Sequence, residues 1–197
     1  MENLRELLVD ELKDLYSAEK QIVRALPKIA RGAESEELKA ALNEHLEATK
    51  GQVTRLEEVF GHLEEKPKAK ACKGMEGLLG EGAECLEEDE KGGLRDLKLI
   101  GAAQRVEHYE VAAYGTAKAM AEKLGLDEAA ELLDQTLKEE EEADQKLTEV
   151  ASGLYEEVSS EEEDEGEDAG QEEDEEGEAA GVAPSRGGRS QRRSKSA

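Results

Sequence analysis

Four long segments of this chain carry apolar residues at alternating spacings of four and three, the repeat that places side chains along one face of an α-helix. Glycine, proline and capping residues bound these segments at roughly 3–31, 35–62, 92–124 and 127–154. Aromatic residues make up only 3% of the chain, whereas Ala, Leu, Glu and Lys are abundant, and this composition also favours helices. Burying four such stripes together most simply gives an all-α four-helix bundle.

The connections between the segments predict how the bundle is wound. Short turns join the first two segments and the last two, so each pair should be antiparallel. Residues 63–92 form a much longer connection that contains Pro67 and a short amphipathic piece around 75–88, which we expect to be an extra helix. This connection is long enough to cross the bundle and let the third helix run parallel to the second. Pro27 lies inside the first segment, and we expect it to kink that helix or end it early.

The chain is strongly acidic, with 51 Asp and Glu against 26 Lys and Arg and a formal net charge of −25. Residues 161–178 hold 13 of these acids, and a short basic stretch rich in Ser and Gly follows at 184–195. Neither stretch has the apolar residues needed to offset the entropy of ordering it, so we expect 159–197 to be a disordered acidic-then-basic tail. The tail takes 13 acids and 5 bases, which leaves the expected bundle domain, 1–158, with 38 acids, 21 bases and a net charge of −17.

Charge and composition also exclude several classes of protein. A surface this acidic repels phosphate, so we expect no nucleic-acid binding beyond weak contact through the basic C-terminal end. No stretch approaches the roughly 18 apolar residues that cross a membrane, and the N-terminus lacks the apolar core of a secretory signal, which predicts a cytoplasmic protein. Cys72 and Cys85 are too few for a disulfide scaffold and fit a reducing compartment.

Polar residues interrupt each apolar stripe near its middle, where a bundle core should be apolar. Burying an ionised carboxylate alone costs several kcal/mol, and no Lys or Arg lies on the stripes at these levels to compensate. Carboxylates and imidazole are ligands for iron and manganese, and bundle cores that hold two metal ions draw carboxylates from all four helices. We therefore predict a dinuclear iron or manganese site whose ligands are Glu19, His45, Glu107, Glu110, Glu140 and Asp144, with Thr49, Gln52 and Gln104 on the same stripes.

A plainer interpretation is that some Glu residues fall at core positions by chance in so acidic a chain, and a drift of one residue would move them to a solvated flank. The usual di-iron bundle carries Glu-x-x-His on two helices, and this sequence has no such pair, so any site must be carboxylate-rich. His108 should lie just outside the site or at the surface, and His62 at the surface. Tyr16 and Tyr109 are close enough in sequence to the candidate ligands to lie just outside the site.

Two blocks of sequence are distinctive: Val106-Glu107-His108-Tyr109-Glu110, and Cys72-Lys73-Gly74-Met75-Glu76-Gly77-Leu78 in the long connection. Together with the stretches at 15–21, 45–52 and 136–147, they resemble the YciE/YciF family of bacterial stress-associated proteins, over about residues 2–156. The resemblance implies a ferritin-like four-helix bundle with a long crossover, a homodimer and a dinuclear metal site. The biochemical activity of that family is itself poorly defined, and the acidic tail lies outside the resemblance.

Two functions follow as hypotheses. In the first, the protein is a metal-binding stress-response protein whose pair of iron or manganese ions oxidises Fe(II) or handles peroxide. In the second, it is a non-catalytic structural or assembly protein that presents an acidic helical surface and uses no metal. Replacing Glu107 or Glu140 by Leu should leave stability unchanged or raise it under the second hypothesis. Loss of bound metal on the same change would instead favour the first.

Overall fold

The computed structural model describes residues 2–177, which are helical or in loops and contain no strand. The helices are α1 (Glu2–Gly32), α2 (Glu36–His62), α3 (Lys73–Cys85), α4 (Gly92–Leu124) and α5 (Asp127–Gly177). The all-α prediction is therefore confirmed. Contacts divide the chain into residues 1–158 and residues 159–197, and the bundle described below belongs to the first unit. No helix among the described residues is both long and apolar enough to cross a lipid bilayer.

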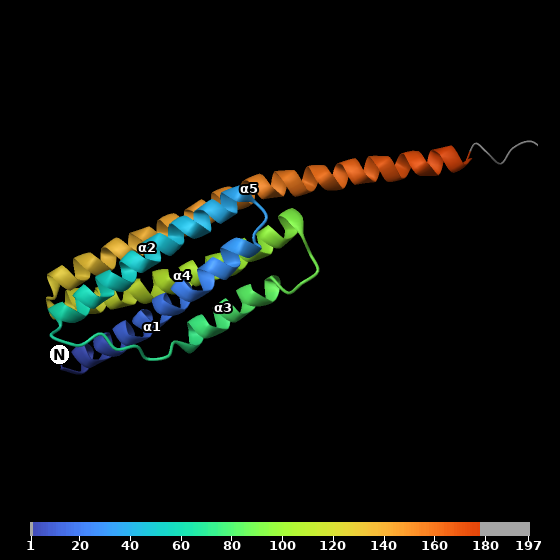
Figure 1. Ribbon diagram of the computed structural model, residues 1–197. Coiled ribbons are helices and arrows are strands. Elements are labelled where there is room, and N and C mark those ends of the chain that lie inside the picture. The colour runs from blue at the N-terminus through green and yellow to red at the C-terminus, as the bar shows by residue number, and fades with distance from the viewer. Residues whose placement is uncertain (1, 178–197) are drawn as a thin grey trace, which may run out of the picture. The chain divides into compact units, whose positions relative to one another are not determined.

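The four long helices are wound with a single long crossover (Figure 1). The helices α1 and α2 form an antiparallel pair, and the chain then returns along the bundle through residues 63–91. As a result α4 runs parallel to α2, and α5 turns back antiparallel to α4. This is the topology that the length of the connection allowed and that the resemblance implied.

The short helix of the crossover packs against α1 and α4. It begins after Cys72, whose side chain accepts a hydrogen bond from the backbone N–H of Met75, and it ends at Cys85. Both thiols are free. The predicted extra helix is thus present, with its start a little earlier than the amphipathic pattern indicated.

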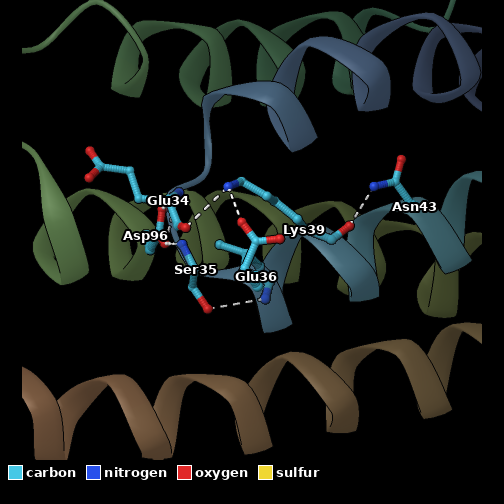
Figure 2. Close-up of polar contacts among 7 residues, drawn as sticks. Glu34, Ser35, Glu36, Lys39, Asn43 and Asp96 are labelled. Carbon is cyan, nitrogen blue, oxygen red and sulfur yellow. Dashed lines mark hydrogen bonds and ion pairs between the residues drawn. The ribbon is translucent and has the colours of Figure 1, made fainter.

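A carboxylate from α4 fixes the turn between α1 and α2. Ser35 caps α2, and its side chain accepts a hydrogen bond from the N–H of Leu38 at 3.3 Å. Buried Asp96 accepts hydrogen bonds from the backbone N–H groups of Glu34 and Ser35 at 2.5 to 3.1 Å (Figure 2). These N–H groups lie at the start of α2, where unsatisfied donors and the helix dipole favour negative charge. Asp96 therefore ties α4 to the start of α2.

Helix α1 continues through Pro27 to Gly32, so the proline does not end it early. Leu26 and Ala30 are buried on either side of Pro27. A proline inside a helix costs about 3 kcal/mol through a lost hydrogen bond and a steric clash. Packing of the surrounding apolar face offsets that cost here.

Helix α5 extends from Asp127 to Gly177 and so includes most of the acidic segment. Glutamate, which is frequent in 161–177, is a good helix former and needs no apolar face to favour helical backbone. That residues 159–197 form a separate, disordered tail stays a prediction. Its basic end, at 184–195, lies outside the described residues.

The core of the bundle consists of two apolar clusters with a polar layer between them. One cluster includes Leu12, Phe60, Ala117 and Leu133, and the other includes Ile22, Leu38, Leu99 and Val150. Each long helix passes from one cluster to the other through buried polar residues: Glu19 on α1, Thr49 and Gln52 on α2, Glu107 and Glu110 on α4, and Thr136 and Glu140 on α5. The interruptions seen in the four stripes therefore meet in one layer.

Candidate metal centre

Four side chains of the polar layer converge on one point. His45 of α2, Glu107 and Glu110 of α4, and Glu140 of α5 each offer a ligand atom within 4.8 Å of the others. The Nε2 atom of His45 lies 3.5 Å from Glu107 Oε1 and 3.9 Å from Glu140 Oε2. Glu107 and Glu110 are one helical turn apart, so both point from α4 into the bundle. All three glutamates are buried.

Glu19 brings a further buried carboxylate from α1, so that all four long helices contribute. Its Oε1 atom accepts a hydrogen bond from the hydroxyl of Tyr114, whereas its Oε2 atom has no hydrogen-bond partner. Burial raises the pKa of Glu19 well above its ordinary value, and the nearby charge of Glu140 raises it further. Glu19 is thus a neighbour of the four converging side chains.

The layer concentrates polar atoms that lack partners. Among the described residues, nine buried side-chain nitrogen and oxygen atoms form no hydrogen bond, and seven of them belong to Glu19, His45, Glu107, Glu110 and Glu140. Buried polar atoms in folded proteins are nearly always hydrogen-bonded. A buried cation site requires several atoms with free lone pairs close together, and this layer provides seven such atoms.

The protonation of the layer follows from its burial. Burial is the main cause that raises the pKa of Glu107 and Glu110 well above the ordinary value, and it raises the pKa of Glu140 to about 7. Burial also lowers the pKa of His45 to about 4, so its imidazole is neutral at pH 7 and can donate a lone pair. Without a cation, burial thus favours the protonated form of these carboxyl groups, and a bound cation would displace the protons.

A cation that the sequence did not indicate lies at the edge of the layer. Arg55 of α2 donates hydrogen bonds to both carboxylate oxygens of Glu139 at 2.8 Å, and to the hydroxyl of Thr136 at 2.7 Å. The expectation that no Lys or Arg lies on the stripes at this level holds, because Arg55 lies beside the stripe of α2 rather than on it. Arg55 pairs with Glu139, so it mainly offsets the charge of Glu139 and not that of the converging carboxyl groups.

Asp144 does not join the group. It is half-buried, and its carboxylate lies 3.0 Å from Gln104 Nε2 and 3.4 Å from Nε2 of His108, which is exposed as expected. The α-helix repeats every 3.6 residues, so positions that follow a 3.5-residue spacing drift around its surface. Leu137 and Asp144 are seven residues apart and so occupy equivalent positions in that spacing. Both are half-buried at the flank of α5, whereas Glu140 is buried.

Neither tyrosine predicted to lie just outside the site contacts the converging side chains. The hydroxyl of Tyr16 donates to Glu57 at 2.7 Å, near the surface. The hydroxyl of Tyr109 donates to Asp14 at 2.7 Å and lies 2.9 Å from the sulfur of Cys72. These two hydroxyls therefore link α1 to α2 and to α4, away from the converging side chains.

Tyr114 is the tyrosine of this site, and sequence reasoning gave it no role beyond a place in the stripe. Its side chain is fully buried and its hydroxyl donates to Glu19. It follows Glu107 by two helical turns and Glu110 by one, so it lies on the same face of α4. This spacing was the signal that could have revealed it.

The donor set is compatible with a metal site rich in carboxylate ligands. Other di-iron bundles place Glu and His three residues apart on one helix, and here Glu107 and Glu110 occupy that spacing. Four carboxylates and one imidazole form an oxygen-rich set, which suits iron and manganese better than the softer, sulfur-preferring metals.

Comparison with known proteins places the chain in a family. Residues 3–159 match the family described as a domain of unknown function, DUF892. Protein YciF of Escherichia coli (strain K12) is 47% identical over 152 residues, which span 77% of this chain and 92% of that protein.

Solved structures agree with this placement. The crystal structure of the E. coli stress protein YciF has a TM-score of 0.77 at 45% identity, and the match covers 79% of this chain and 99% of that one. YcfI from Rhodopseudomonas palustris has a TM-score of 0.72 at 41% identity, with 74% and 92% covered. Ferritin-like, diiron-carboxylate proteins of Bacillus anthracis str. Ames match at a TM-score of 0.60 and 15% identity, over 77% and 99% of the two chains, and so share the fold alone. The chain therefore belongs to the YciE/YciF family, DUF892, and has its ferritin-like bundle.

Proposed function

We propose that this protein is a ferritin-like stress-response protein that holds a pair of iron or manganese ions in the polar layer and oxidises Fe(II) or removes peroxide. The observation that carries the proposal is the convergence of unpartnered carboxylate and imidazole atoms from α2, α4 and α5, beside the unpartnered Oε2 of Glu19 on α1. Glu107, Glu110, Glu140 and His45 would hold the ions, with Glu19 completing the set from α1. When bound, such a pair supplies reversible one-electron chemistry to a substrate and its oxidant.

The chain's own residues prepare the layer for this role. The carboxyl groups hold protons while no cation is bound and release them on binding, which keeps the interior close to neutral in both states. The hydroxyl of Tyr114 orients Glu19 through its hydrogen bond. Arg55 binds Glu139 at the edge of the layer, and this ion pair neutralises the negative charge of Glu139 next to the buried carboxyl groups. The apolar clusters lie on either side of the layer and pack the rest of the core.

Metal loading of the full chain tests the proposal. Protein freed of metal with a chelator is mixed anaerobically with Fe(II) or Mn(II), desalted, and measured for metal content and melting temperature. We expect retained metal and a higher melting temperature in the wild type, and neither in Glu107→Ala. Glu141→Ala, an exposed change beside the site, should behave as the wild type. Less than about a tenth of an equivalent of either metal, with no gain in melting temperature, contradicts the proposal.

The alternative function is a metal-free structural or assembly role. Burial raises the pKa of the layer's carboxyl groups, so protonation alone can keep the layer folded. The name given to the related YcfI suggests a structural role for that protein. Under this alternative, Glu107→Leu and Glu140→Leu keep or raise stability, and no variant differs from the wild type in metal content.

A homodimer is part of the proposal in either case, as the resemblance implied. Size-exclusion chromatography of the full chain with light scattering tests it. A mass twice that of the 21.5 kDa chain supports the homodimer, and a mass equal to that of one chain contradicts it.

A further inference from the structure

A cleft of about 260 Å³ opens between α2 and α5 and reaches the polar layer. His45 and Glu107 line it, and their side chains are only 10% and 3% exposed. His45 Nε2 and Glu107 Oε2 are both among the atoms without hydrogen-bond partners. The cleft therefore joins unpartnered atoms of the candidate metal centre to the outside of the bundle.

The lining of the cleft is strongly acidic, with four glutamates and a single lysine. Glu44 of α2 and Glu142 of α5 are exposed, and neither forms an ion pair with another described residue. Glu139 differs, because it is paired with Arg55. The lysine, Lys146, lies 4.0 Å from Glu37 Oε1, so its charge is partly matched outside the cleft.

Small side chains keep the cleft open. Ala48 of α2 and Ala143 of α5 are half-buried and line the walls between the acidic residues and the layer. Larger side chains on two packed helices would bring opposing atoms into contact and fill the space. The cleft thus combines small wall residues with negative charge along its lining.

A second cavity of about 40 Å³ meets the same pair from another side, but it suits a cation poorly. Apart from His45 and Glu107, its lining consists of apolar residues and Gly82, including Ile22, Leu79 and Val106. A hydrated divalent ion would have to lose its water there without compensating ligands, which is costly.

We propose that the acidic cleft between α2 and α5 is the route by which divalent cations reach the polar layer, and that Glu44 and Glu142 capture them transiently at its mouth. This inference rests on the proposed function. A cleft lined by one sign of charge between low-dielectric walls focuses the field and raises the local concentration of counter-ions, which speeds association. Glu44 and Glu142 act on the rate of loading, whereas the buried residues determine how much metal is held.

Stopped-flow mixing of the metal-free full chain with Co²⁺ tests this, because Co²⁺ absorbance reports coordination directly. In the double variant Glu44→Gln, Glu142→Gln, we expect the association rate constant to fall about fivefold at low ionic strength, with the final amount bound unchanged. The difference should shrink in about 0.5 M salt, where charges are screened within a few ångströms. The control pair Glu58→Gln, Glu131→Gln removes the same charge from exposed sites on the same helices outside the cleft.

A steric variant provides an independent measurement. Ala143→Leu narrows the cleft without altering a ligand, and we expect it to slow association and dissociation together, so that the affinity hardly changes. Ala40→Leu, on an exposed position of α2 outside the cleft, should leave both rates as in the wild type. Circular dichroism shows whether each variant is folded. If Ala143→Leu does not fold, the charge variants decide the question, because they alter only exposed positions.

The outcomes separate this inference from the proposed function. If the wild type binds Co²⁺ and both the charge and the steric variants load at its rate, the cleft is not the route, while the metal-binding function stands. If the wild type binds no Co²⁺ in the layer, both are overturned. Slower loading of the Glu44 and Glu142 variant but not of the control pair supports the route.

Discussion

Two buried carboxylates on the same helix illustrate what distinguishes a structural acid from a candidate ligand. Asp96 and Glu110 both lie on α4, and they are 1% and 0% exposed. Asp96 accepts hydrogen bonds from the backbone N–H groups of Glu34 and Ser35 (Figure 2). Both oxygens of Glu110 lack a partner. The two carboxyl groups are therefore equally buried, but only Asp96 has hydrogen-bond donors next to it.

The comparison has an energetic consequence. Asp96 compensates for its lost hydration with charge-assisted hydrogen bonds and should stabilise the fold. The carboxyl groups of the polar layer have no such compensation without a cation and should cost stability until one binds. Substitutions at the two places should consequently have opposite effects on the metal-free protein.

The largest effect is expected at Asp96. Asp96→Ala removes the buried acceptor and breaks the part-buried hydrogen bonds from the backbone N–H groups of Glu34 and Ser35, so we expect a loss of about 3 kcal/mol in the free energy of unfolding. Urea unfolding measures it. Asp96→Asn keeps one acceptor oxygen and should lose less, and metal content should match the wild type in both. A loss below about 0.5 kcal/mol would mean that the hydrogen bonds at the α1–α2 turn do not stabilise the protein.

The opposite sign is expected at Glu110. Glu110→Leu removes an unpartnered buried acid, so we expect the metal-free protein to gain about 2 kcal/mol at neutral pH. Added Mn(II), which should raise the melting temperature of the wild type, should leave that of Glu110→Leu unchanged. Calorimetry with and without Mn(II) measures both. If Glu110→Leu weakens the metal-free protein and Mn(II) still stabilises it, Glu110 is a structural acid like Asp96.

The pH dependence sharpens the same contrast. Burial raises the pKa of Glu140 from 4.5 to about 7 in the folded protein, so the folded state holds the proton more tightly than the unfolded state. The contribution of Glu140 to metal-free stability is therefore fully present below pH 4.5 and is lost as the pH rises to about 7. Glu140→Leu removes this titration, so its stability relative to the wild type should rise progressively over that range, by roughly 2 to 3 kcal/mol. A difference independent of pH, in urea unfolding at several pH values, would contradict the raised pKa.

The smallest effect concerns Glu19. It is intermediate between Asp96 and Glu110, because one of its carboxylate oxygens has a hydrogen-bond partner and the other has none. Tyr114→Phe removes that hydrogen bond while keeping the ring, and we expect a loss of about 1 kcal/mol in the metal-free protein. Metal affinity should weaken several-fold, because Glu19 is no longer oriented. Titration calorimetry with Mn(II) measures the affinity. Tyr16→Phe, whose hydroxyl contacts Glu57, is the control and should leave metal affinity as in the wild type.

Much of this arrangement could be predicted from the sequence, because a helix buries one face and the 3.6-residue period shows which. The apolar stripe of α1 and the positions of Glu19, Glu107 and Glu140 followed from that rule, and all of these are buried. The rule is less certain at the flank of a stripe, where a rotation of a few tens of degrees decides exposure. Asp144 fell on that margin and lies outside the group.

Other features depend on partners that no local pattern reveals. Asp96 is satisfied by a turn some 60 positions away in the chain, so its structural role appears only in the folded protein. Arg55 reaches the edge of the layer from beside its stripe, because its long side chain extends to Glu139 on another helix. The spacing indicated which acids are buried. Whether a buried acid has hydrogen-bond donors nearby, which is the difference between Asp96 and Glu110, depends on the tertiary structure.

Anomalous diffraction from crystals of the full chain grown with Mn(II) tests the central claim most directly, because it locates the metal rather than its effects. We predict a pair of anomalous peaks in the polar layer, among Glu107, Glu110, Glu140 and His45, and none beside Asp96. An ordered layer without anomalous density at saturating Mn(II) would show that these carboxyl groups keep their protons instead, and would contradict the metal centre.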